Sequence, residues 1–285
     1  MDVPLATVEL SFDGTFELGE GDAEILLQLH SNDVMWQKER LLNLLIDRLP
    51  VDCDRIAWID CDVVFMRKDW PPLVLEALEK FKLIQLYANR LNLTHDATEK
   101  HFWSDDLDKV VQLRRKSFGS AISDGHVPEA DFGQVPTPDA DRGCCGLAWA
   151  STREILEQNG LYDACILGGS DRLMAATALG RFDLATEKQS MIESRQRHFL
   201  PWARNFYRAI QGKVGFLPLS LLHLWHGDYK DRQYITRYSI LNSNDFDPAN
   251  DIALDDEGVW KWSSHKPKMH SAVKEYFDSR HEDGR

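Results

Sequence analysis

One short stretch, residues 56–62 with the sequence Ile-Ala-Trp-Ile-Asp-Cys-Asp, constrains the fold of this chain more than any other. Four apolar residues in a row predict a strand that is buried on both faces, which is typical of a parallel sheet covered by helices. Asp60 and Asp62 follow at the carboxyl end of that strand, where ligands bind in open α/β sheets. Two carboxylates can hold a hard divalent cation there, and the cation can hold phosphates. We therefore expect a metal-assisted site for a substrate that carries a diphosphate.

The Asp-x-Asp pattern is weak evidence by itself, because the chain is acidic. It recurs at Asp52/Asp54, Asp106/Asp108, Asp139/Asp141 and Asp245/Asp247. Polar residues surround these four pairs, so each fits a solvated loop or a helix cap. Only Asp60 and Asp62 follow an apolar strand, although carboxylates that accept backbone N–H bonds in a turn remain the alternative for them too.

Composition narrows the class of protein. The 285 residues, 43% of them hydrophobic, can form one large α/β domain. A net charge of -13 argues against a nucleic-acid binder and against attraction to anionic membranes. The five cysteines lack the paired spacing of a zinc site, and no signal-peptide pattern opens the chain, so we expect reduced thiols and a cytoplasmic location. The most apolar stretch, residues 214–225, is too short to span a bilayer.

Strand and helix patterns alternate along the chain, which predicts an α/β fold with a mostly parallel, Rossmann-like sheet flanked by helices. We expect one catalytic domain over residues 1–245 and a packed extension over residues 246–285. Between residues 88 and 142 the pattern weakens to a long loop with one amphipathic helix at 107–115. The clearest predicted strands are 5–10, 25–29 and 82–87, and the clearest predicted helices are 36–49, 71–81, 151–158 (capped by Ser151), 168–179 and 187–210.

Several segments share an order and spacing with one known family. They are Trp-Gln-Lys-Glu-Arg-Leu-Leu-Asn at 36–43, Gly146 to Gly160 with its Ser and Asn-Gly, Gly-Gly-Ser-Asp at 168–171, and His223-x-x-His226. Together they resemble the metal-dependent glycosyltransferases of the GT-A fold, and most of all the β-1,4-galactosyltransferase family. The resemblance covers roughly residues 36–226. It does not specify the sugar or the acceptor, because Ile166-Leu167 stand where that family has a tryptophan before Gly-Gly.

The resemblance implies a donor site around a Mn²⁺ or Mg²⁺ ion. It implies that Asp62 ligates the ion, and that Asp60 binds it through water or holds the donor ribose. His226 is the third candidate ligand. We favour it over His223, because residues three apart in an extended segment point to opposite faces and Gly227 permits close approach to His226. Lys38 and Gly146 are the further donor-binding candidates, and a solvated helix cation is the alternative for Lys38.

The same resemblance places the acceptor at Gly169, Ser170 and Asp171, and Trp149 is an acceptor-binding candidate because an aromatic ring can stack on a sugar face. Asp171 is the candidate general base, since transfer with inversion needs a carboxylate to take the proton of the acceptor hydroxyl. The alternatives are that Asp171 and Ser170 only cap a helix and that Trp149 packs in the core.

We therefore expect a metal-dependent glycosyltransferase that moves a sugar from a nucleotide-diphosphate sugar, UDP rather than GDP, to a glycan or other hydroxyl acceptor. Inversion is favoured, and a retaining mechanism stays open. One alternative is a haloacid-dehalogenase-like phosphatase with Asp60 as nucleophile. The other is a carbohydrate-binding relative without catalysis.

Overall fold

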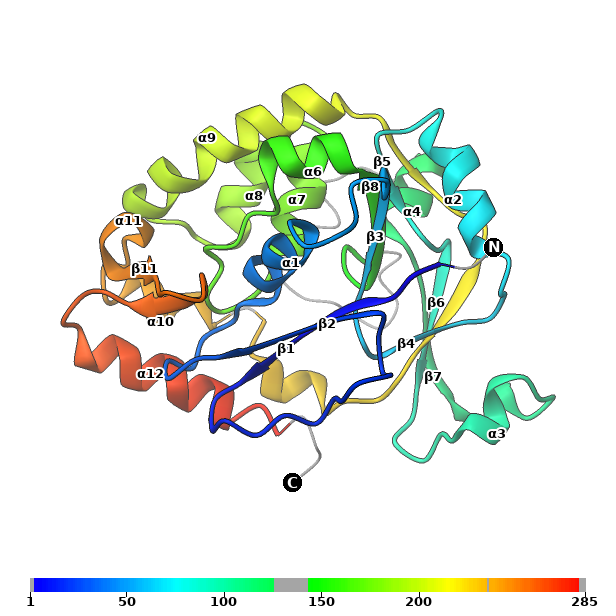
Figure 1. Cartoon of the computed structure of the whole chain (residues 1–285), viewed down its shortest axis with the longest axis horizontal. Coiled ribbons are helices and arrows are strands. Elements are labelled where there is room, and N and C mark those ends of the chain that lie inside the picture. The colour runs from blue at the N-terminus through cyan, green and yellow to red at the C-terminus, as the bar shows by residue number, and fades with distance from the viewer. Residues whose placement is uncertain (1–2, 126–142, 235, 282–285) are drawn as a thin grey trace.

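The computed structural model describes residues 3–125, 143–234 and 236–281, and its strands and helices alternate along the chain as an α/β fold (Figure 1). The strands are β1 (Ala6–Ser11), β2 (Ile25–His30), β3 (Arg55–Ile59), β4 (Val63–Phe65), β5 (Leu83–Gln85), β6 (Asn89–Leu93), β7 (Val111–Lys116), β8 (Ala148–Thr152), β9 (Val214–Phe216), β10 (Ser220–His223), β11 (Ile252–Leu254) and β12 (Trp260–Trp262). The helices are α1 (Lys38–Ile46), α2 (Trp70–Leu78), α3 (Glu99–Phe102), α4 (Phe118–Ser123), α6 (Arg153–Asn159), α7 (Ser170–Ala178), α8 (Phe182–Lys188), α9 (Glu193–Ile210), α10 (Tyr238–Asn242), α11 (Pro248–Asp251) and α12 (Pro267–Asp278), with 3₁₀ turns η1 (Leu107–Val110) and η2 (Tyr229–Arg232). In these ranges, no helix combines the length and the apolar character that crossing a bilayer requires.

The sheets are mixed, so the prediction of a mostly parallel sheet is wrong. In the described residues, the strands form two four-stranded sheets, β3-β8-β5-β9 and β4-β10-β6-β7, and the pairs β1-β2 and β11-β12. Among these, only β1-β2, β5-β9 and β6-β10 pair in parallel. Strand β8 runs antiparallel to both β3 and β5, because the chain returns to the sheet from the opposite end.

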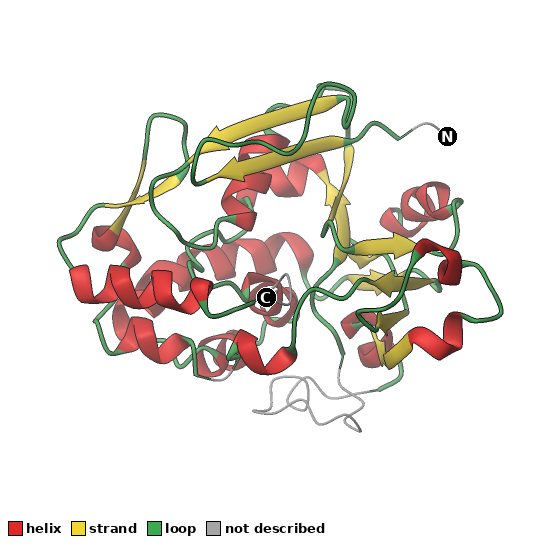
Figure 2. Cartoon of the chain, turned by 90° about the horizontal axis from the view of Figure 1, so that it is seen from below, coloured by secondary structure: helices red, strands yellow, loops and turns green. Residues whose placement is uncertain are grey.

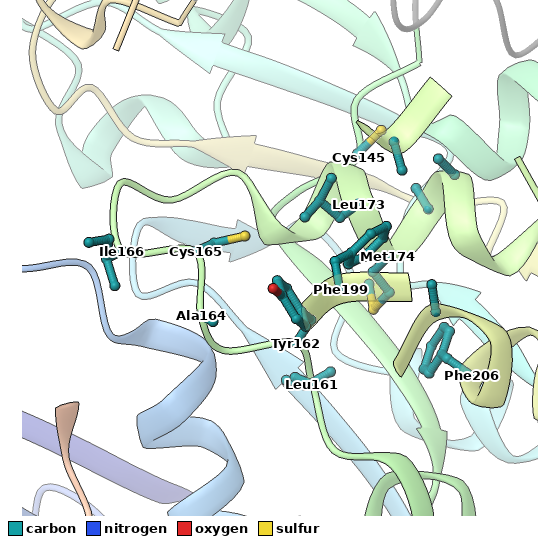
Figure 3. Packing of buried hydrophobic residues seen from close by; sticks show 14 of the residues in the cluster. Cys145, Leu161, Tyr162, Ala164, Cys165, Ile166, Leu173, Met174, Phe199 and Phe206 are labelled. Carbon is teal, nitrogen blue, oxygen red and sulfur yellow. The ribbon is translucent and has the colours of Figure 1, made fainter. Parts of the chain in front are cut away.

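The sheet β3-β8-β5-β9 separates two apolar clusters. Successive side chains of a strand point to opposite faces, so Trp58 and Trp149 enter one cluster while Ala57 and Ala148 enter the other. Helices α6 to α9 cover the first face, and α2 lies on the other side (Figure 1). Most of the long helices lie side by side in one half of the molecule (Figure 2). Figure 3 shows the first cluster, where Tyr162 and Phe199 lie beside Leu173 and Met174.

Two predicted helices differ from the observed ones. The helix predicted at residues 107–115 is wrong, because the chain there forms η1 and then β7. Val111 and Leu113 alternate with polar residues, and pairing with β6 stabilises the extended form. The helix after β8 begins at Arg153, two residues later than predicted, and Thr152 rather than Ser151 caps it. The Ser151 hydroxyl instead donates to the carbonyl oxygen of Lys82 at 2.7 Å.

Most of the other predicted strands and helices are confirmed in position. Predicted strands at 5–10, 25–29 and 82–87 coincide with β1, β2 and β5, and predicted helices at 36–49, 71–81 and 168–179 coincide with α1, α2 and α7. The helix predicted at 187–210 is divided between α8 and α9. Part of the predicted loop, residues 126–142, lies outside the described residues.

The C-terminal segment joins the same core as the rest of the chain. Gln37 exchanges two hydrogen bonds with the backbone of Trp260, at 2.6 and 3.0 Å. Met269, Val273 and Tyr276 of α12 belong to the first apolar cluster. Strand β12 is therefore fixed to the start of α1, and α12 is anchored in the core.

Candidate metal and acid-base site

The short connection between β3 and β4 carries Asp60 and Asp62. Strand β4 pairs antiparallel with β10, and the register sets His223 opposite Val63. The backbone N–H of Leu224 donates to the carbonyl oxygen of Asp62 at 2.8 Å. This pairing brings the segment around His223 against the turn that carries Asp60 and Asp62.

Asp62, His223 and His226 form a cluster of metal-ligating atoms. The Oδ2 atom of Asp62 lies 3.4 Å from Nε2 of His223 and 3.1 Å from Nε2 of His226. The two imidazole nitrogens are 3.1 Å apart. All three ligand atoms lie within 4.8 Å of one another. No other group of three such residues occurs in the described part of the chain.

One oxygen of Asp62 indicates that this cluster binds something. Its Oδ1 atom is buried and has no hydrogen-bond partner among the described residues. A buried polar atom without a partner is costly and rare in native proteins. Two imidazoles and a carboxylate form a donor set that suits Mn²⁺, Co²⁺ or Zn²⁺ better than Mg²⁺. The residues present therefore fit a divalent transition metal.

Both histidines face Asp62, which differs from the prediction that favoured His226 alone. The prediction assumed an extended segment through both residues. Strand β10 ends at His223, however, and the chain then turns, so that both rings lie on one side. The ring planes are nearly perpendicular, at 88°.

Burial and charge set the protonation of this cluster. Burial alone would raise the pKa of Asp62, but the hydrogen bond from His223 and the charges of both histidines hold it below its usual value. Burial, assisted by the positive charge of Arg232, lowers the pKa of His226 to about 4, although Asp62 opposes this effect. An ionised carboxylate and a neutral imidazole are the forms that bind metal.

Lys38, Asp60 and Asp171 form a second cluster. The Nζ atom of Lys38 lies 3.1 Å from Oδ1 of Asp60 and 2.9 Å from Oδ2 of Asp171. Lys38 opens α1, and Asp171 lies in the first turn of α7. Burial opposes the charge of Lys38, but the carboxylates of Asp171 and Asp60 outweigh it and hold the pKa of Lys38 well above its usual value. Burial raises the pKa of Asp60, against the lowering effect of Lys38.

Asp60 therefore faces Lys38 and does not belong to the three-residue metal cluster. The sequence placed Asp60 and Asp62 together at the metal, but residues two apart across this turn serve different clusters. Gly146 lies at the second one, since a Cβ atom there would be 3.4 Å from Oδ2 of Asp171. The predicted donor-binding residues Lys38, Asp60 and Gly146 thus meet around Asp171.

The Gly168-Gly169 turn that precedes Asp171 is packed against the side chain of Tyr238. Gly169 has φ +93°, and a Cβ atom there would lie 2.1 Å from the Tyr238 hydroxyl oxygen. That hydroxyl donates to the carbonyl oxygen of Gly168 at 3.2 Å and accepts from Arg237 at 2.8 Å. Only glycine satisfies both the left-handed backbone and this close approach. The turn is fixed, so the position of Asp171 is fixed with it.

Two of the predicted acceptor residues are in the wrong place for that role. Trp149 is fully buried between sheet and helices, and its indole N–H donates to the carbonyl oxygen of Cys145 at 2.8 Å. A ring without exposed surface cannot stack on a sugar. The Ser170 side chain is buried, and its hydroxyl donates to the carbonyl oxygen of Tyr162 at 2.6 Å. Core packing, the alternative for Trp149, is the observed role.

Two further residues lie at the site: Glu39, which has no signal in the sequence, and Arg232, which the sequence suggests only as a weak candidate for contact with phosphate. Glu39 is 4% exposed and accepts a hydrogen bond from the Trp36 indole at 3.0 Å. Its Oε1 atom accepts no hydrogen bond in the described residues but lies 3.8 Å from Nζ of Lys38. Burial raises the pKa of Glu39 to about 7, although Lys38 opposes this. A cavity of about 10 Å³ lies among Lys38, Glu39 and Asp171, roughly the space of one water. Arg232 is the other residue, and its guanidinium contacts the His226 ring.

The other Asp-x-Asp pairs behave as surface groups where the structure describes them. Asp54 pairs with Arg55 at 2.6 Å, Asp106 pairs with Lys109 at 2.6 Å, and Asp247 caps α11. Asp139 and Asp141 lie outside the described residues.

Comparisons of the chain with protein-family models, with curated proteins and with solved structures give no match. Any assignment of function to this chain therefore depends on the geometry of the two clusters and on the sequence motifs that form them.

Proposed function

We propose that this chain is a metal-dependent glycosyltransferase with a GT-A-like, Rossmann-like arrangement. It transfers a sugar from a nucleotide-diphosphate sugar, UDP rather than GDP, to a hydroxyl of a glycan or other acceptor. The observation that carries the proposal is the convergence of Asp62 Oδ2 with the imidazoles of His223 and His226. The other oxygen of Asp62, Oδ1, is buried and has no hydrogen-bond partner in the described residues. The resemblance of residues 36–43 and 168–171 to the galactosyltransferase family supplies the substrate class.

The three residues would hold Mn²⁺ or Mg²⁺, and their two imidazoles favour Mn²⁺. A bound divalent cation neutralises the charge that develops on a departing nucleoside diphosphate. Asp171 takes the proton of the acceptor hydroxyl as that oxygen attacks the anomeric carbon, with inversion. Lys38 orients Asp171 and balances its charge before the acceptor binds. Asp60, on the other side of Lys38, faces the donor.

A panel of nucleotide sugars tests the proposal. Each is added with Mn²⁺ or with a chelator, and the melting temperature and the release of nucleoside diphosphate are measured. A ligand that binds only the native state raises the melting temperature. One UDP-sugar is therefore expected to raise it when Mn²⁺ is present and not when the chelator is present. Metal-independent binding of glycans without turnover would contradict the proposal. So would release of phosphate from a simple monoester with phosphate trapped on Asp60.

A further inference from the structure

Arg232 holds its positive charge directly against a metal-ligating residue. Its Nη2 atom contacts Nδ1 of the His226 ring and lies 3.3 Å from Nε2 of the same ring. It also donates to the carbonyl oxygen of His226 at 2.8 Å. The same Nε2 atom lies 3.1 Å from Oδ2 of Asp62 and 3.1 Å from Nε2 of His223. A guanidinium nitrogen is thus packed beside the point where three ligand atoms converge.

A divalent cation and this guanidinium compete for His226. An imidazole that ligates a metal aims a nitrogen lone pair at it from about 2 Å. The guanidinium carries only donors and stays charged at any accessible pH. A metal ion on Nε2 would therefore lie within a few ångströms of a second positive charge. Binding of the ion requires the side chain of Arg232 to move away from His226.

The backbone at Arg232 is held by a contact with α12, so the change in position falls on the side chain. Turn η2 follows its N-cap residue Asp228 and ends at Gln233, whose φ is +45°. The Tyr276 hydroxyl of α12 donates to the carbonyl oxygen of Arg232 at 3.2 Å, which holds the backbone in place. The guanidinium then stays next to the metal centre after it leaves His226. A phosphate group is the partner that such a planar, multiply donating cation binds best.

We propose that Arg232 exchanges between His226 and the anionic group of a metal-bound ligand. In the absence of that ligand Arg232 opposes binding of the cation, and in its presence Arg232 binds the diphosphate. The identity of the anion rests on the proposed function, whereas the competition for His226 does not. Replacing Arg232 should therefore raise the affinity for the cation alone and lower the affinity for a cation that carries a diphosphate.

Replacing Arg232 by Met tests both roles, with Arg197→Met as the matched control. Arg197 lies on α9 and is largely exposed, so its loss removes the same charge at a distance. Two probes are titrated: Mn²⁺ alone, followed by its electron paramagnetic resonance signal, and the preformed complex of Mn²⁺ with inorganic pyrophosphate. We expect Arg232→Met to bind Mn²⁺ about three- to tenfold more tightly and the pyrophosphate complex about tenfold less tightly. The control is expected to leave both within about twofold of the wild type.

Both affinities unchanged, or both shifted in the same direction, would overturn the exchange. If Arg232→Met does not fold, Arg232→Gln must show the same opposite shifts. A wild-type protein that binds Mn²⁺ and a nucleotide sugar, with an Arg232 variant that changes neither probe, refutes only the exchange. A wild-type protein that binds no divalent cation refutes the exchange and the proposed function together.

Discussion

Asp60 and Asp62 are two residues apart on one turn, yet their surroundings differ in one decisive respect. The charge of Asp60 is compensated within the protein by Lys38, which also holds Asp171. Asp62 faces two imidazoles, and its second oxygen has no partner in the described residues. A buried carboxylate with a charged partner is satisfied, whereas a buried carboxylate oxygen without a hydrogen bond carries a free-energy cost that a bound ligand would remove. Under the proposed function, the cluster of Lys38, Asp60 and Asp171 positions an acid-base group, and the cluster of Asp62, His223 and His226 binds a cation.

Replacing Asp171 is expected to have the largest effect, and to affect sugar transfer without affecting Mn²⁺ binding. Asp171→Asn removes the general base and is expected to lower sugar transfer by about 10²- to 10⁴-fold, with the affinity for Mn²⁺ unchanged. Steady-state transfer rates and Mn²⁺ titration measure the two quantities. Asp183→Asn is the control, because Asp183 occupies the first turn of α8 and pairs only with Arg181 in the contacts observed. Transfer that survives in Asp171→Asn within about tenfold places the base elsewhere.

Replacing Asp62 is expected to affect Mn²⁺ affinity much more than replacing Asp60. Asp62→Asn removes a ligand charge and is expected to weaken Mn²⁺ binding by about 100-fold or more. Asp60→Asn changes a residue of the same type and is expected to leave that affinity within about threefold, because its carboxylate faces Lys38. Titration calorimetry of both variants decides the matter. An equal loss of Mn²⁺ affinity in the two variants would show that Asp60 and Asp62 belong to one metal site.

Loss of Lys38 is expected to act on stability. Lys38→Met leaves the carboxylates of Asp60 and Asp171 without a counter-charge and is expected to lower the free energy of unfolding by about 2–3 kcal/mol. This value is at the lower end for a broken buried pair because each of these side chains is about one-quarter exposed. Lys80→Met, which breaks the exposed pair with Glu76, is expected to cost about 0.3 kcal/mol. Urea unfolding of both variants checks this, and equal small losses would show that the Lys38 cluster is solvated.

A still smaller change is expected in the pH dependence of stability. The pKa of Glu39 is raised in the native state to about 7 from its usual 4.5, so the native protein binds more protons than the unfolded chain between these values. The contribution of Glu39 to stability is therefore greatest below pH 4.5 and is lost as pH rises to 7. Glu39→Gln is expected to remove this slope and to stabilise the protein by roughly 2 kcal/mol at pH 8. Unfolding by urea at pH 5 and pH 8 measures it. An unchanged slope in Glu39→Gln would assign the pH dependence to other groups.

The sequence predicted the strand end with Asp60 and Asp62 and the helix start at Asp171, because both depend on local patterns. Four apolar residues define β3, and Gly-Gly before α7 defines the turn. It also predicted Lys38 and Gly146 as donor-binding residues and Asp171 as an acceptor-binding general base. The structure brings these residues together.

The features that the sequence left open or missed depend on contacts between distant segments. His223 joins the metal cluster because β10 ends there and pairs with β4, and Arg232 contacts His226 only through the turn after that strand. Residues 111–116 form β7 because β6 lies beside them, which outweighs their helical pattern. The face of β8 on which Trp149 lies is likewise set by its neighbours in the sheet.

Anomalous diffraction from crystals of the protein grown with Mn²⁺ would locate the bound cation itself. We predict one strong peak about 2.0–2.3 Å from a carboxylate oxygen of Asp62 and from the Nε2 atoms of both His223 and His226. A protein that binds Mn²⁺ at Asp60 and Asp171 instead, or that shows no peak between the two histidines, would contradict the division of the turn into a metal-binding and an acid-base carboxylate.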